Sequence, residues 1–151
     1  MPNSQAMATS FKTELLNGIH AFGTTVIRAA TTKDVVRAAI YLASATVNAT
    51  TTVYSATGEA SGTGYTAGGV VVTTNTVPAA TGTTAFVTPS ASIVFSGVTL
   101  TTSFDCVLLY NATQANRAIS VHTFTAQTIT AGTLTLTMPV NDAVTGLIRL
   151  A

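Results

Sequence analysis

Val53 to Val72 read Val-Tyr-Ser-Ala-Thr-Gly-Glu-Ala-Ser-Gly-Thr-Gly-Tyr-Thr-Ala-Gly-Gly-Val-Val-Val, and this stretch divides the chain. Its centre, residues 58–69, holds five of the 11 glycines, and we call it the glycine segment. Glycines this dense permit positive φ angles and close approach of one backbone to another. We therefore expect a structured turn or excursion here. An apolar strand and the one convincing helix precede it, and Thr-rich strands follow it.

Composition narrows the class of protein. The chain has 151 residues and a mass of 15.3 kDa, which suits one domain. Charged residues make up only 7%, against about 25% in typical soluble domains. No apolar run approaches the ~20 residues of a membrane span, and the N-terminus lacks the pattern of a signal peptide. No basic run provides the footprint of nucleic-acid binding. We expect neither membrane nor nucleic-acid partners.

The low charge bears on assembly. A weakly charged surface is poor at keeping a protein monomeric, so the chain is a candidate for burial in a larger assembly. The alternative is a Thr-rich β-domain that tolerates a neutral surface.

The first part of the chain contains one helical pattern and one apolar run. Residues 1–9 are polar and are predicted as an arm. Ser10 can cap a short helix, in which Phe11, Leu15, Ile19 and Phe22 recur at helical spacing. Residues 35–43 are nearly all apolar, which favours a central strand covered on both faces, with a helix as the competing interpretation. Val26-Ile27 is a candidate for a short strand.

Short strands dominate the rest of the chain. Strict alternation at residues 133–138 predicts a strand with one buried face, and Gly97 suits a β-bulge. Residues 77–82 and 111–116 are predicted as turns. The whole pattern indicates an all-β protein, an antiparallel β-sandwich with the jelly roll as one candidate connectivity, and one short N-terminal helix. Residues 10–151 form a single domain behind the arm. Further strands are expected at 70–74, 84–87, 92–100, 105–110, 119–124 and 147–150.

No group of residues forms a catalytic or ligand-binding pattern. Gly62 to Ala67 fits G-x-G-x-x-A, but no helix is expected after it and no acidic residue follows about twenty positions later, as a dinucleotide site requires. His20 and His122 lack metal-ligand spacing. Cys106 lies in an apolar strand and is expected to be a small buried hydrophobe. The sequence therefore predicts no enzyme activity, no cofactor and no metal.

Three pieces of the chain carry a resemblance. They are Phe11-Lys-Thr-Glu-Leu-Leu-Asn-Gly-Ile-His, Gly58-Glu-Ala-Ser-Gly-Thr-Gly-Tyr-Thr-Ala-Gly-Gly and Leu108-Leu-Tyr-Asn-Ala-Thr-Gln-Ala-Asn-Arg-Ala. In order and spacing they resemble small virion structural proteins of tailed bacteriophages, of the head decoration, cement or fibre type. The similarity spans most of the chain, and it departs at residues 26–33, where a more polar turn was expected. The resemblance offers no catalytic residues.

The resemblance implies a decoration or cement protein that stabilises the phage head from its outer surface. It would be made in the bacterial cytoplasm and bind the major capsid protein and its own copies, with a trimer as one candidate oligomer. The alternative is a receptor- or glycan-binding module of a head or tail fibre, or another tail component. We expect the glycine segment to contact the partner, with Tyr65 as an aromatic anchor. The predicted interface residues are Glu59, Gly62, Gly64, Tyr65, Gly68 and Gly69.

Overall fold

The structure, a computed structural model, describes residues 3–8, 10–11, 15, 19–20, 32–74 and 76–151. In this part of the chain every element described from end to end is a β-strand, and every strand pair is antiparallel. The all-β prediction is confirmed. The strands are β1 (Ala6–Met7), β2 (Val36–Leu42), β3 (Val70–Val71), β4 (Ala79–Thr81), β5 (Thr84–Val87), β6 (Ile93–Asn111), β7 (Arg117–Leu136) and β8 (Ile148–Leu150).

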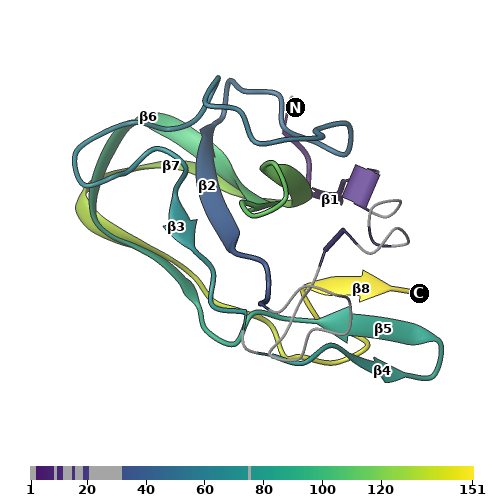
Figure 1. Cartoon of the computed structure of the whole chain (residues 1–151). Helices are drawn as coiled ribbons and strands as arrows, with labels where there is room; N and C mark the ends of the chain where they lie inside the picture. The colour runs from purple at the N-terminus through teal and green to yellow at the C-terminus, as the bar shows by residue number, and fades with distance from the viewer. Residues whose placement is uncertain (1–2, 9, 12–14, 16–18, 21–31, 75) are drawn as a thin grey trace.

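The described strands form two antiparallel sheets. The larger has five strands in the order β1-β7-β6-β2-β3, and the smaller has three in the order β4-β5-β8. In Figure 1, β6 and β7 form one long bent hairpin that runs from the β1 end of the molecule to the end where the small sheet lies. The jelly-roll connectivity stays a prediction.

The β6–β7 hairpin is the largest element. Its two strands have 19 and 20 residues, whereas we predicted several shorter strands in the same places. The register shifts at several points along the pair, and one shift lies between Phe95 and Val98, where Gly97 has φ 64°. The bulge predicted at Gly97 is confirmed. Bulges bend a strand without ending it, which explains why the separately predicted segments join.

Strand β2 lies inside the large sheet. It pairs with β6 along its whole length and with β3 at Arg37 and Ala38. Ala38, Ala39 and Ile40 are fully buried. A run of apolar residues without alternation suits a strand covered on both faces, so the central strand is confirmed and the competing helix is wrong.

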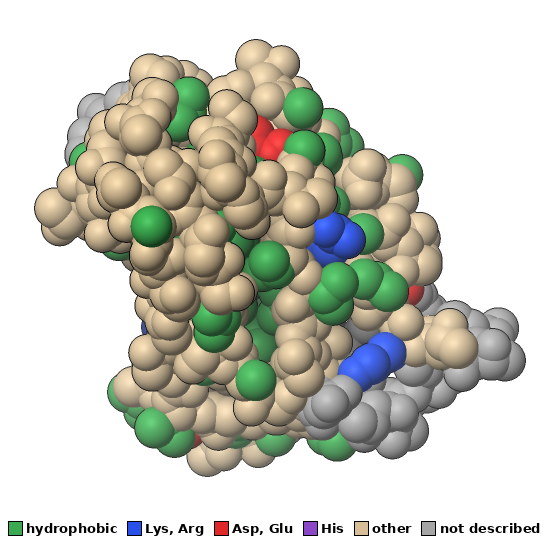
Figure 2. Space-filling view, turned by 90° about the vertical axis from the view of Figure 1, so that its left-hand side faces the viewer, with side chains coloured by type: hydrophobic (Ala, Val, Ile, Leu, Met, Phe, Trp, Pro, Cys, Tyr) green, Lys and Arg blue, Asp and Glu red, His purple; other side chains and the backbone are tan. Residues whose placement is uncertain are grey.

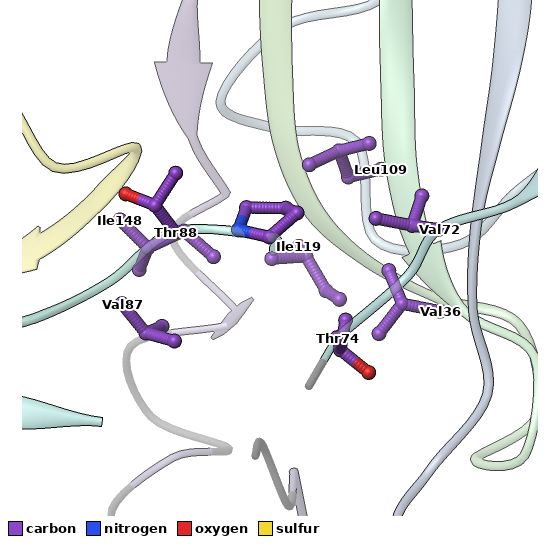
Figure 3. A pocket seen from close by; sticks show the side chains of 9 residues that line it. Val36, Val72, Thr74, Val87, Thr88, Leu109, Ile119 and Ile148 are labelled. Atoms are coloured by element: carbon purple, nitrogen blue, oxygen red, sulfur yellow. The ribbon is translucent and has the colours of Figure 1, made fainter. Parts of the chain in front are cut away.

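The two sheets meet through apolar side chains. Figure 3 shows Val36, Leu109 and Ile119 of the large sheet facing Val87 and Ile148 of the small sheet across a narrow gap. The cavity between them is about 10 Å³, at the lower limit of what one water molecule needs, and its lining is apolar. The junction is therefore a dry, closely packed contact.

One predicted turn is wrong. Residues 77–82 contain β4, whose Ala79 pairs with Phe86 and whose Thr81 pairs with Thr84 of β5. The tight turn of this hairpin contains Gly82, at φ 60°. Pro78 precedes the strand, and all three residues of β4 are exposed, as suits an edge strand beside a proline. Pro78 and Gly82, which favoured a turn, instead flank a short strand.

The N-terminal residues add a strand to the large sheet. Ala6 and Met7 pair with Val121 and Ser120 of β7. The fully buried Asn3 side chain donates to the Asp105 carboxylate at 2.5 Å and accepts from the Val47 amide at 2.9 Å. Residues 3–8, which we predicted to be part of an arm, therefore lie on the body of the domain.

The predicted N-terminal helix and the predicted strand at Val26-Ile27 fall largely outside the described residues, and both stay predictions. The described residues nearby show one firm contact. Phe11 is fully buried, and its ring meets the ring of His20 edge to face at 4.8 Å. The start of the chain thus contributes to the core.

Candidate functional site

The glycine segment begins as an extra partner of β2. The Leu42 amide donates to the Gly58 carbonyl, and the Ala60 amide donates to the Ile40 carbonyl, both at 2.9 Å. Residues 58–60 therefore occupy the edge of β2 opposite β6, beside the short strand β3. The segment is built into the sheet at its start.

The segment then crosses to β6. The Thr99 amide donates to the Thr63 carbonyl at 2.9 Å. Glycine is required at this crossing, because a Cβ atom on Gly62 would lie 1.9 Å from the Thr99 carbonyl oxygen and one on Gly64 2.2 Å from that of Gly97. Both glycines are exposed on their outer side. The glycines predicted as interface residues thus let the backbone lie flat on β6.

The segment ends against β2. Gly69 has φ 67°, and a Cβ atom there would lie 1.7 Å from the Ala38 carbonyl oxygen. Arg37 donates from Nε to the Gly68 carbonyl at 3.0 Å and from Nη2 to the Gly69 carbonyl at 2.6 Å. Gly68 and Gly69 are both buried. The return of the chain is therefore fixed by an arginine as well as by the sheet.

Glu59 holds the interior of the segment together. Its Oε2 accepts a hydrogen bond from the Tyr54 hydroxyl at 2.6 Å. Its Oε1 accepts from the Tyr65 hydroxyl at 2.7 Å and from the Gly68 amide at 2.8 Å. A carboxylate that accepts several hydrogen bonds makes stronger bonds than a neutral acceptor. Glu59 thereby ties both ends of the segment to its middle.

All four tyrosines of the chain take part in this arrangement. The Tyr65 hydroxyl also accepts from the Ile40 amide at 3.0 Å. Tyr110 donates to the Gly68 carbonyl at 2.7 Å, and Tyr41 to the Ser55 carbonyl at 2.5 Å. The Tyr54 and Tyr110 rings stack at 4.7 Å. We call Glu59 and these four tyrosines the Glu59 cluster.

The environment keeps these hydroxyls protonated. Burial, opposed in part by the hydrogen bond to Ser55, raises the pKa of Tyr41 to about 12. Burial and the hydrogen bond to Glu59 raise the pKa of Tyr65 and of Tyr54 well above the usual value near 10. A neutral tyrosine donates, whereas a phenolate would repel the Glu59 carboxylate. The cluster is built for hydrogen bonding rather than for proton transfer near neutral pH.

The structure gives the predicted anchor, Tyr65, an internal role. Its hydroxyl is engaged by Ile40 and Glu59, and its ring stacks on Phe95 at a centroid distance of 6.0 Å. Glu59 is half-buried and engaged in the same way. Contact between the six predicted interface residues and a partner stays a prediction. The outward face of the segment consists of its exposed residues 61–64 and 66–67.

A second polar cluster was not predicted. The buried Asn111 side chain lies with its Nδ2 3.0 Å from His20 Nδ1 and donates to Asp34 Oδ2 at 2.7 Å. Its Oδ1 accepts from the amides of Thr113 and Gln114 in the turn between β6 and β7. The feature of the sequence that could have indicated this cluster is an asparagine directly before a polar turn. The cluster positions that turn.

The remaining candidate groups lie within the large sheet. Cys106 is fully buried, as predicted, and burial raises its pKa to about 12. Ser120 Oγ lies 2.9 Å from His122 Nε2, and burial lowers the pKa of His122 to about 4. Ser120 is buried, and its backbone is paired with Met7 of β1. Among the described residues, no three His, Cys, Asp or Glu side chains gather as metal ligands, and no helix is long and apolar enough to cross a membrane.

No protein-family model, no curated protein and no solved structure matches this chain.

Proposed function

We propose that the protein is a structural component of a bacteriophage virion, a decoration or cement protein on the outer surface of the head. Its partners are the major capsid protein and further copies of itself. It is made in the bacterial cytoplasm and acts without enzymatic chemistry. The proposal joins the sequence resemblance to the neutral surface of the fold, and it includes a β-sandwich of the jelly-roll type as the architecture of the domain.

The observation that carries the proposal is where the charges lie. Of the eight charged residues in the described part of the chain, Arg149 is exposed, six are half-buried and Asp34 is buried. Arg37 and Glu59 are engaged within the glycine segment, and Asp105 accepts from Asn3. Figure 2 accordingly shows a face made mostly of neutral polar and apolar groups, with few charged ones. Such a surface is poorly adapted to isolation in water and well adapted to burial against other subunits.

The rigidity of the glycine segment supports a binding role. A loop that is already ordered loses less entropy when it binds than a mobile one. The outward residues Thr63 and Thr66 are presented by a backbone that β2, β6 and the Glu59 cluster hold in place. We place the contact with the shell at this outward face.

Stabilisation of a head by such a contact follows from mass action. A protein that binds the assembled shell and not its separate subunits stabilises the shell by RT ln(1 + [L]/Kd). No catalytic group is needed for this effect.

The exposed side chains favour shell binding over the fibre alternative. The large hydrophobic side chains exposed in the described residues are seven valines and one leucine. Recognition sites commonly present aromatic anchors, and the tyrosines here are engaged in the Glu59 cluster. A receptor- or glycan-binding module would be expected to expose aromatic rings on its loops.

Cryo-electron microscopy of the virion that carries this chain tests the proposal. We expect density for the bent β6–β7 hairpin on the outer face of the capsid. Density on the tail would favour the fibre alternative, and absence of the chain from purified virions would overturn both.

A binding experiment tests the place of contact. Thr63→Lys adds a charge to the outward face, and Thr83→Lys adds the same charge in the turn between β4 and β5, where the residue is also exposed. We expect Thr63→Lys to reduce sedimentation with undecorated heads and Thr83→Lys to leave it unchanged. Equal binding by both variants would place the contact elsewhere.

A further inference from the structure

The outer edge of β7 is largely uncovered. β1 pairs with it only at Ser120 and Val121. From Thr123 to Leu136, the main-chain pairing of β7 within the described part of the chain is with β6 alone. An edge strand presents a row of unpaired amide and carbonyl groups, which is a template for another strand.

This edge lacks most of the devices that prevent pairing. No charged residue occurs between Arg117 and Asp142, and no proline between Arg117 and Pro139. Natural edges are often blocked by lysine, proline or bulges. Bulges are present here, because β7 carries extra residues relative to β6 between Thr123 and Gln127 and around Ala131, at φ 46°. The regular run that remains is Gly132 to Leu136.

The pattern of this run indicates which strand would fit. Residues 133–137 read Thr-Leu-Thr-Leu-Thr, which is the same in both directions. The three threonines are exposed, Leu134 is buried and Leu136 is half-buried. An antiparallel pair about Thr135 would place Thr133 opposite Thr137 and Leu134 opposite Leu136 of the other strand. Threonine pairs and apolar pairs both stabilise antiparallel strands.

We propose that residues 133–137 pair with the same residues of a second copy of this chain, antiparallel and related by a two-fold axis at Thr135. Such an interface is self-complementary, because each strand presents the same edge. It extends the large sheet across both copies, with leucines on one face and threonines on the other.

The proposal deepens the proposed function, on which it rests for its biological setting, by naming a contact between copies. Five residue pairs bury much less than the roughly 1,600 Å² of a standard interface. The free protein should therefore pair weakly, whereas copies held side by side on a shell would pair readily at high effective concentration.

Cysteine cross-linking of the whole chain tests the register. Under mild oxidation at high protein concentration, Thr135→Cys should form a disulfide dimer roughly tenfold faster than Thr83→Cys, since pairing raises the local thiol concentration. Thr133→Cys and Thr137→Cys should each link slowly alone and quickly when mixed. The native Cys106 is fully buried, and mass spectrometry of the linked peptides identifies the bond.

The cross-linking rates decide whether residues 133–137 pair between two copies. Equal rates for Thr135→Cys and Thr83→Cys, or equal rates for the mixed and separate Thr133 and Thr137 variants, would overturn the proposal. Head binding by the same variants in their reduced form is measured separately by sedimentation. Normal head binding without cross-linking would reject the edge contact alone, and cross-linking without head binding would reject the decoration role alone.

Discussion

The two halves of the β6–β7 hairpin belong to the same two strands and differ in what surrounds them. In the half near the turn, residues 104–111 and 117–123, β2 pairs with β6, and β1 pairs with part of β7. In the far half, residues 93–103 and 124–136, the glycine segment makes one short bridge to β6, and no described strand pairs with the outer edge of β7.

The burial of residues in each half of the hairpin depends on how many segments lie beside it. Residues 106–111 are all buried in the near half, whereas buried and accessible residues mix in the far half. Strand length alone therefore does not make a core. A strand covered on both faces needs a continuous apolar run, and a strand covered on one face needs alternation. Both patterns occur within one hairpin.

The largest effect should come from the core of the near half. Leu109 is 2% exposed and lines the junction of the two sheets. Leu109→Ala should lower the free energy of unfolding by roughly 2–5 kcal/mol, because it removes buried methyl groups and leaves a cavity. Leu136→Ala, at a half-buried site in the far half, should cost at most about 2 kcal/mol. Urea unfolding measures the free energy of unfolding of both variants. Equal losses would contradict the difference in burial between the two halves of the hairpin.

The next effect should come from the glycine segment. Gly69→Ala would force a Cβ atom to 1.7 Å from the Ala38 carbonyl oxygen at a positive φ angle. We expect a loss of roughly 2–4 kcal/mol. Gly97→Ala is the matched control, because φ is +64° and nothing lies within 4 Å of its Cβ position, so only about 1–2 kcal/mol of backbone strain is added. A smaller loss at Gly69 than at Gly97 would show that the segment is not seated on β2.

A smaller effect should come from one hydroxyl of the Glu59 cluster. Tyr65→Phe leaves the Ile40 amide without its acceptor and removes one donor from Glu59. The expected loss is roughly 1–3 kcal/mol. Tyr54→Phe removes only the bond to Glu59 and should cost less. Thermal unfolding monitored by circular dichroism measures both, and an unchanged melting temperature for Tyr65→Phe would contradict the role of the cluster.

A further effect should appear as pH dependence. The pKa of Tyr41 is raised to about 12 in the folded state, so stability should fall as the pH rises above about 10, where the unfolded chain loses that proton first. The pKa of His122 is lowered to about 4, so stability should also fall as the pH decreases from about 6.5 to 4. Tyr41→Phe should reduce the alkaline limb only in part, because the raised pKa values of Tyr54, Tyr65 and Cys106 also make stability fall at high pH. His122→Gln should flatten the acid limb. An unchanged profile in either variant would reject that assignment.

Sequence patterns predicted the strands that have strong local signals. The apolar run at residues 35–43 and the alternation at residues 133–138 predicted β2 and the end of β7. The strands β1 and β4 were not predicted, because Ala-Met and Ala-Ala-Thr carry little strand signal of their own, whereas the equally short β3 and β8 contain Val-Val and Ile-Arg-Leu. The Glu59 cluster joins tyrosines that lie far apart in the chain, from Tyr41 to Tyr110. No local pattern indicates that such residues converge, although the glycine density correctly marked the segment they hold.

Amide hydrogen exchange on the dilute protein compares both halves of the hairpin and the glycine segment in one experiment. We predict strong protection at Ile40, at Ala60 and across residues 106–110, and rapid exchange at the outward-facing amides of residues 124–136. Equal protection along the whole hairpin would contradict the difference between its two halves. Rapid exchange at Ile40 and Ala60 would contradict the pairing of the glycine segment with β2.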